Sequence, residues 1–208
     1  MKIALHVNAS PLGQSSRAYR LARQAAANLA AKEGGVVLVE RDLATKCPPP
    51  ITAQYADAIA RRAETGLPVF KESETLIREL DACDYLIVST PMHNFSVPAS
   101  LKLWIDYILR DGRTFSYRDG YKVGLLRDRP TLVIVGSGSE HEGPRARQPD
   151  YLSPYFTHVL ATIGIEDVHF IRLQGLVQPD FAAEAIASGE RQLAANPVFG
   201  LTSAPRGS

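Results

Sequence analysis

The fold is decided by residues 84–109, which read DYLIVSTPMHNFSVPASLKLWIDYIL. Residues 84–90 are an apolar, partly β-branched run, which predicts a strand buried on both faces of a sheet. Residues 99–109 carry apolar side chains at helical spacing. The eight residues from Pro91 to Pro98 are therefore predicted to be a loop at the carboxyl end of a strand, where open α/β sheets bind ligands. Met, His, Asn and Phe together make this loop either a well-packed connection or part of a binding site.

The same alternation of strand and helix continues on both sides of this stretch. It predicts a doubly wound α/β domain with a five-stranded parallel sheet. A strand-like segment at 113–117, the turn signal Asp119-Gly120 and an end near Leu126 predict a small extra hairpin outside the sheet. We expect one domain over residues 1–200 and a flexible tail or cloning remnant at 201–208. The predicted strands are 2–8, 36–41, 84–90, 130–135 and 167–173, and the helices are 16–32, 52–63, 69–80, 99–109, 149–163 and 181–195.

Composition excludes several classes of function. The 208 residues are 45% hydrophobic and 22% charged, which is ordinary for a soluble globular domain. A net charge of +1 gives no electrostatic case for nucleic acid or an anionic membrane surface. No apolar run approaches the about 18–20 residues of a membrane span, and a strand-like start leaves no room for a signal peptide. Cys47 and Cys83 form no CxxC or metal-ligand pattern, so we expect a cytoplasmic protein without a metal.

The loop between the first strand and the first helix, residues 8–17, reads NASPLGQSSR. Its serines and exposed N–H groups converge on the positive end of a helix, which favours an anion such as a phosphate. The alternative is simple N-capping of the helix by Ser15 or Ser16. The loop is neither GxGxxG nor GxxxxGK[ST], so it is not predicted to be a dinucleotide fingerprint or a P-loop.

Three loops, those after the first, third and fourth strands of the sheet, are expected on one rim. The third of them, residues 136–144, is rich in Gly and Ser, which let a backbone approach a flat ligand closely. An anion site beside an apolar surface and a flat surface suits a phosphorylated aromatic cofactor better than a small polar substrate. No loop supplies a nucleophile with an adjacent base. His6, His158 and His169 are expected to be packed core residues, whereas His93 is placed to face a ligand.

Taken together, these motifs are familiar. The chain resembles the FMN-dependent NADH azoreductase family, whose members are also NADH:quinone oxidoreductases of flavodoxin-like fold. The resemblance runs along nearly the whole chain and is most specific where the Pro-Met-x-Asn-Phe loop is followed by Leu-Lys-x-Trp-Ile-Asp. The matching segments are residues 8–11, 41–43, 91–98, 101–106, 113–117 and 163–165.

This resemblance implies a flavin site and an assembly. Ser10 and Ser16 match serines that hold the FMN phosphate, and the backbone of Arg17 and Ala18 closes the cradle. Tyr117 matches an aromatic residue on the substrate side. NADH or NADPH is the expected electron donor, and a homodimer with two flavins at the subunit interface is the expected assembly. Beside the isoalloxazine ring we expect Met92, His93, Asn94 and Phe95, and at its other polar edge Ser137, Gly138 and Ser139.

The chain departs from the family pattern at three positions. His93 stands where the family usually has Tyr. Ala18 replaces a second cradle serine, for which the neighbouring Ser15 is a substitute. Thr162 replaces an aromatic residue that often precedes Ile163-Gly164-Ile165. FMN binding is expected to survive these changes, and Thr162 is the change that concerns the substrate pocket.

The resemblance implies a two-electron, ping-pong oxidoreductase that passes a hydride from NAD(P)H through FMN to quinones, with azo compounds as a further class of acceptor. His93 is expected either to donate a proton or hydrogen bond to the acceptor or to form a steric wall. One alternative is a flavodoxin-type electron carrier without substrate turnover, for which the near-neutral charge gives no support. Another is a flavin-free phosphate-binding or signalling domain, although the first strand ends in Asn8-Ala9-Ser10 rather than in carboxylates.

Overall fold

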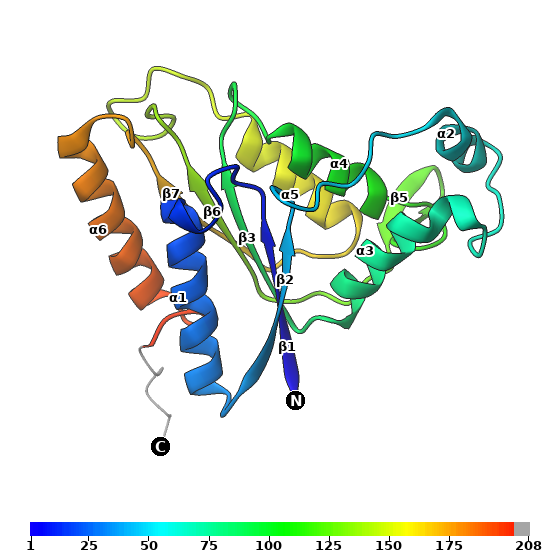
Figure 1. The fold of residues 1–208 in the computed structure, drawn as a ribbon, viewed down its shortest axis with the longest axis horizontal. Coiled ribbons are helices and arrows are strands. Elements are labelled where there is room, and N and C mark those ends of the chain that lie inside the picture. The colour runs from blue at the N-terminus through cyan, green and yellow to red at the C-terminus, as the bar shows by residue number, and fades with distance from the viewer. Residues whose placement is uncertain (202–208) are drawn as a thin grey trace.

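A computed structural model describes residues 1–201 and shows a parallel five-stranded sheet in the order β2-β1-β3-β6-β7 (Figure 1). The predicted doubly wound sheet is thus confirmed. The chain leaves β1 toward β2 on one side and returns to β3 on the other, so the order reverses between β1 and β3, where such sheets open a ligand crevice. The predicted tail falls on residues that, apart from Leu201, lie outside the described part. The strands are β1 Lys2–Asn8, β2 Val36–Asp42, β3 Tyr85–Pro91, β6 Thr131–Gly136 and β7 Val168–Leu173.

Helices cover both faces of the sheet (Figure 1). Helices α1 (Arg17–Lys32) and α6 (Pro179–Ala195) lie on one face. The other face carries α3 (Lys71–Ala82), α4 (Ala99–Ile108) and α5 (Leu152–Thr162), with α2 (Ala53–Ala60) projecting beyond them. Alternate residues of β1 serve the two cores: Ala4 packs with α1, whereas Leu5 and Val7 pack with the opposite layer. Two buried faces explain the nearly continuous apolar runs of the strands.

Several helix boundaries differ from prediction by two or more residues, including the start of α6 at Pro179, and three of these differences have a local reason. Helix α2 ends at Ala60 because Arg62 takes a left-handed conformation with φ 51°. Helix α3 begins at Lys71 because Pro68–Phe70 forms a 3₁₀ turn, and it runs on to Ala82. Helix α5 begins at Leu152 because Asp150 Oδ1 accepts the Ser153 N–H at 2.8 Å and satisfies the first turn from outside.

The predicted hairpin is present as β4 (Phe115–Arg118) and β5 (Tyr121–Gly124), paired antiparallel and separate from the sheet. Its turn has positive φ at Asp119 and Gly120, the combination that a two-residue type I′ turn requires. A Cβ on Gly124 would lie 2.1 Å from the Gly164 nitrogen, so only glycine fits where the hairpin meets the end of α5.

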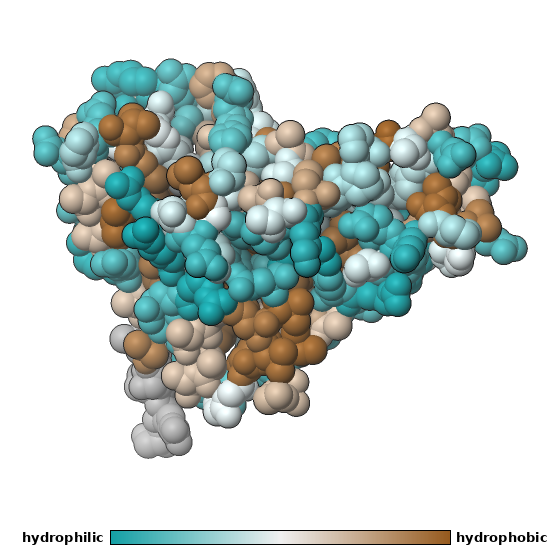
Figure 2. Space-filling view, in the orientation of Figure 1, coloured by the Kyte–Doolittle hydropathy of each residue, from teal (hydrophilic) through white to brown (hydrophobic). Residues whose placement is uncertain are grey.

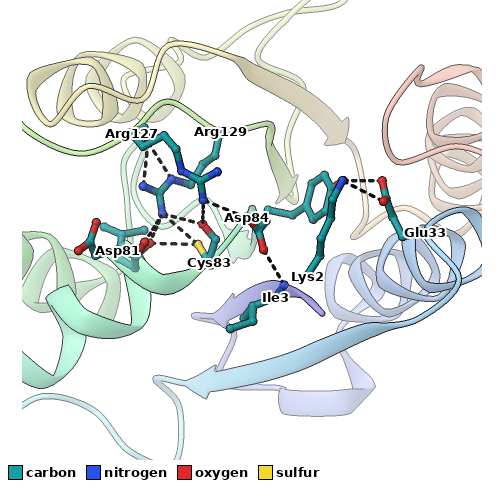
Figure 3. A network of polar contacts seen from close by, with 10 residues as sticks. Lys2, Ile3, Glu33, Asp81, Cys83, Asp84, Arg127 and Arg129 are labelled. Carbon is teal, nitrogen blue, oxygen red and sulfur yellow. Dashed lines mark hydrogen bonds and ion pairs between the residues drawn. The ribbon is translucent and has the colours of Figure 1, made fainter.

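The amino-terminal edge of the sheet is closed by a polar network around Arg129 (Figure 3). The Arg129 guanidinium is buried and donates to the Leu80 and Cys83 carbonyls at the end of α3 and to the Arg127 carbonyl. Burial raises the pKa of the Cys83 thiol, so this cysteine is structural rather than reactive. Open α/β sheets bind their ligands at the other, carboxyl edge.

An apolar patch lies on the outer surface of the molecule. In Figure 2 hydrophobic residues gather low on the face shown, over β1 and β2, and Val37 of the edge strand β2 is one of the exposed apolar residues. Within residues 1–201, no helix has both the length and the apolar character needed to cross a membrane.

Candidate functional site

A pocket with a volume of ≈ 630 Å³ opens at the carboxyl edge of the sheet. It is built by the loops after β1, β3 and β6, as predicted, and also by the loop after β7. Its size is that of a small-molecule site. Eight residues predicted at the site line it: Ser10, Ser16, Arg17, Ala18, Met92, His93, Ser137 and Gly138. Ser15, the expected substitute for a second cradle serine, lines it as well. The remaining lining residues, which sequence reasoning did not assign as ligands, are Leu12, Arg20, Thr90, Pro91, Gly136, Leu176 and Val177.

The start of α1 forms a cradle of hydrogen-bond donors in this pocket. Ser16 caps the helix, its Oγ accepting the Tyr19 N–H at 3.4 Å, so the capping alternative is confirmed for Ser16. Capping does not exclude anion binding, because the N–H groups of Arg17 and Ala18 have no acceptor among residues 1–201. These two donors stand at the positive end of the helix, beside the hydroxyls of Ser10, Ser15 and Ser16.

Two arginine side chains add positive charge to the cradle. Arg17 and Arg20 both line the pocket, and neither forms an ion pair with a carboxylate in the described part of the chain. Arg17 Nη1 instead donates to the Leu176 carbonyl at 3.3 Å. The pocket lining includes no Asp or Glu, so the cradle offers donors and cations only, which fits a phosphate.

A smaller pocket of ≈ 310 Å³ between α1 and α6 shares Arg17 and Arg20 with the first. It also holds Glu190, whose carboxylate disfavours an anion there. We therefore assign the phosphate-binding geometry to the larger pocket. Over the described residues, no group of three or more His, Cys, Asp or Glu side chains is placed to hold a metal ion.

The loop after β3 is a tight turn rather than an irregular connection. His93 and Ser96 exchange backbone hydrogen bonds at 2.9 and 3.0 Å, and Met92 N–H donates to the Gly136 carbonyl at 2.8 Å. Asn94 and Phe95 between them have φ of 47° and 72°, so they occupy the two left-handed positions of the turn. Met92 and His93 line the pocket, whereas Asn94 and Phe95 at the tip do not.

Phe95 is strained, because left-handed backbone is costly for a bulky side chain and its ring is 40% exposed. We expect Phe95→Gly to raise the free energy of unfolding by about 0.5–1 kcal/mol. Asn94→Gly is the matched control and should gain less, because Asn tolerates this conformation. Urea denaturation measures both. A loss of stability in Phe95→Gly would mean that the ring packs more closely than its exposure indicates.

The Gly-Ser loop after β6 places only its first residues in the pocket. Ser139 points elsewhere: its carbonyl accepts from Ser137 Oγ at 2.7 Å and from the Gly175 N–H at 3.3 Å. A Cβ on Gly138 would meet Val177 Cγ1 at 2.9 Å, so glycine here admits the loop after β7. Leu176 and Val177 on that loop were missed, although Val177 is an apolar residue at a strand's carboxyl end.

Several predicted residues lie away from the pocket. Tyr117 is on β4, half-exposed, and does not line it. The core prediction was wrong for His158, which is exposed on α5, because it faces away from the sheet. His169 is only half-buried and its Nε2 lies 2.9 Å from Asp167 Oδ1. For His6, which is fully buried in β1, the prediction is confirmed.

Burial lowers the pKa of His6 from 6.5 to about 4, although Glu40 opposes the shift. Because the folded pKa lies below the unfolded value, only the unfolded chain takes up this proton between pH 4 and 6.5. The stabilisation is therefore complete above pH 6.5 and is lost as pH falls toward 4, by roughly 3 kcal/mol. We expect urea midpoints of His6→Gln to fall less on acidification than those of the wild type. Identical slopes would refute the shift.

Comparisons with known proteins agree with this geometry. A family model described as a flavodoxin-like fold matches residues 1–196. FMN-dependent NADH:quinone oxidoreductase 4 of Pseudomonas fluorescens is 48% identical over 200 residues, covering 96% of this chain and 97% of its own. FMN-dependent NADH:quinone oxidoreductase 5 of Burkholderia lata is 47% identical over 186 residues, covering 89% and 91%.

Solved structures share the fold at lower identity. An azoreductase from Bacillus anthracis has a TM-score of 0.79 at 22% identity, covering 92% of this chain and 96% of its own. An FMN-dependent NADH-azoreductase of the same species, solved in complex with FMN, has a TM-score of 0.76 at 24% identity, covering 92% and 97%.

Proposed function

Because the chain belongs to the family of FMN-dependent NADH:quinone oxidoreductases with a flavodoxin-like fold, we propose that it transfers reducing equivalents from NADH to quinones through bound FMN. The family resemblance expected from the sequence is confirmed. FMN, when bound, supplies the hydride chemistry, and the protein supplies binding, orientation and electrostatics. Azo compounds are a further class of acceptor, which the azoreductase structures of the same fold support. The relatives' names describe enzymes, so the alternative of a simple electron carrier is set aside.

One observation carries the proposal: a cradle of donors and cations adjoins a partly apolar pocket. Ser10, Ser16 and the N–H groups of Arg17 and Ala18 would hold the FMN phosphate. Met92 and His93 would flank the ring system from the loop after β3. Ser137 and Gly138 would meet its other polar edge.

His93 lines the same pocket, and we propose that its imidazole donates a proton or a hydrogen bond to the acceptor. His93→Ala should then lower quinone turnover and flatten its pH profile. His93→Gln keeps a hydrogen-bond donor and separates the two roles. Turnover by His93→Ala that stays unchanged across pH would leave the ring as a steric wall.

We propose a cytoplasmic homodimer with a flavin site at each subunit interface, each subunit forming one FMN-binding domain over residues 1–200. The family resemblance supports this assembly. Tyr117, Asn94, Phe95 and Ser139 do not line the pocket of their own subunit. In the proposed dimer, Tyr117 would act on the substrate side of the partner's flavin site. Sedimentation should give twice the mass of the chain. Two heterodimers should then differ in activity. One carries Tyr117→Ala and a flavin-binding defect in the same subunit, and the other carries the two changes in different subunits.

The reaction is tested with apo-protein reconstituted with FMN. Initial rates of benzoquinone reduction, measured over a grid of NADH and quinone concentrations, should give parallel double-reciprocal lines. NADPH in place of NADH ranks the two donors, and an azo dye in place of the quinone ranks the acceptors. Intersecting lines would contradict the ping-pong order, and turnover without added flavin would contradict FMN dependence.

A further inference from the structure

His6 lies directly behind the phosphate cradle and is not part of the pocket lining. It is fully buried in β1, on the face that α1 covers. Its Nε2 lies 2.9 Å from Ser89 Oγ on β3, and its ring centroid lies 5.1 Å from that of Tyr19 on α1. The proposed function uses none of these three side chains. A buried imidazole held this way calls for a separate explanation.

A series of hydrogen bonds connects His6 with the cradle through Ser89 and Asn8, and counting donors and acceptors shows which group donates at each step. Asn8 Nδ2 donates to Asp42 Oδ1 at 3.0 Å, so Asn8 Oδ1 faces the Ser10 N–H at 3.2 Å and Ser89 Oγ at 3.1 Å. An amide oxygen only accepts, so Ser89 gives it its single proton. Ser89 Oγ must then accept from His6 Nε2–H. This series of hydrogen bonds therefore runs in one direction, from His6 as donor through Ser89 to Asn8 as acceptor.

A second arm connects His6 with the first turn of α1. Tyr19 O–H donates to Glu40 Oε1 at 2.8 Å. That oxygen lies 3.5 Å from His6 Nδ1, which carries no proton when Nε2 donates to Ser89 and has no hydrogen-bond partner among the described residues. This arm is therefore the packing of the Tyr19 ring on the imidazole, with 5.1 Å between the ring centroids. Arg23 Nη1 donates to the other Glu40 oxygen at 3.1 Å. Tyr19 also gives its backbone N–H to Ser16 Oγ, the capping atom of the cradle. Both halves of the cradle therefore contact His6, the Ser10 loop through hydrogen bonds and the Ser16 turn through the packing of Tyr19 on the imidazole.

We propose that His6 is the positioning residue of the phosphate cradle, acting through Ser89 and Asn8 on the Ser10 loop and through Tyr19 on the first turn of α1. This inference rests on the proposed function, and it adds His6, which does not line the pocket, to the residues that support FMN binding. A cradle whose two halves are fixed before the ligand arrives loses less conformational freedom on binding, so its affinity for a phosphate is higher.

The test compares His6→Met with His6→Gln, using FMN and riboflavin as probes of the apo-protein. Gln places an N–H near the position of His6 Nε2, whereas Met fills the space without a donor. Loss of one organising hydrogen bond should weaken FMN binding by about tenfold in His6→Met. His6→Gln should stay within about threefold of the wild type. Riboflavin lacks the phosphate, so its affinity should be unchanged in both variants.

Two further variants keep the test decisive if His6→Met folds poorly. Ser89→Ala interrupts the same series of hydrogen bonds, so it should weaken FMN binding without weakening riboflavin binding. Ser73→Ala is its control, because Ser73 is equally buried but donates to the Tyr107 carbonyl at 2.7 Å on the opposite face. Equal losses for FMN and riboflavin in Ser89→Ala, or no loss at all, would overturn the positioning role. A wild-type protein that binds neither flavin would overturn the proposed function itself.

Discussion

Ser15→Asp should weaken FMN binding by about 30–100-fold while leaving the fold intact. Ser15 is exposed, lines the pocket and precedes the capping residue of α1. A carboxylate there would face the phosphate that the cradle is built to hold. Repulsion between a carboxylate and a phosphate dianion about 5 Å apart is roughly 2–3 kcal/mol at an exposed position that is screened almost as well as bulk water, or about 30–100-fold in affinity.

Ser15→Asn is the matched control, since it has nearly the shape of Asp without the charge. It should bind FMN within about threefold of the wild type. Riboflavin should bind wild type, Ser15→Asp and Ser15→Asn alike, and the effect of Asp on FMN should shrink as salt is added. Flavin titration followed by fluorescence measures all three. If Ser15→Asp binds FMN normally, the phosphate does not lie at the start of α1.

Arg129→Met should destabilise the protein by about 3 kcal/mol without changing FMN affinity. The guanidinium is buried and has no carboxylate partner in the described part of the chain. Its charge is balanced by carbonyls at the negative end of α3, including those of Leu80 and Cys83. Met has a similar length but no donors, so these buried carbonyls would lose their partners.

Arg127→Met provides the control from the same network (Figure 3). The Arg127 side chain is mostly exposed, and Nη2 donates to Asp84 Oδ1 at 3.1 Å, so its loss should cost under about 1 kcal/mol. Urea denaturation measures both variants, with unchanged m-values expected. An Arg129→Met variant as stable as Arg127→Met would show that the α3 carbonyls do not depend on Arg129.

The sequence was sufficient to predict those elements that depend on interactions within a short segment. Apolar runs gave the five strands, serine chemistry gave the cap at Ser16, and Asp119-Gly120 gave the hairpin turn. Parallel strands place their carboxyl ends on one edge, so the serine loop and the His93 loop were expected together, and the pocket contains both.

The missed features depend on how separate segments meet. Val177 reaches the pocket because Gly138 leaves space for it, a contact between two loops that neither segment specifies alone. The His6–Ser89 hydrogen bond follows from the register that pairs β1 with β3. Tyr117 lies on a hairpin outside the sheet and does not line the pocket. Its role on the substrate side came from the family resemblance alone and stays a prediction.

The most direct test of the account is an anaerobic titration of FMN-loaded protein with NADH, followed by a benzoquinone. The expected result is that one NADH bleaches one flavin, and that one quinone restores its absorbance rapidly. Such stoichiometry establishes two-electron transfer through a single bound FMN. A flavin that NADH leaves oxidised, or a reduced flavin that the quinone fails to reoxidise, would contradict the assignment as an FMN-dependent NADH:quinone oxidoreductase.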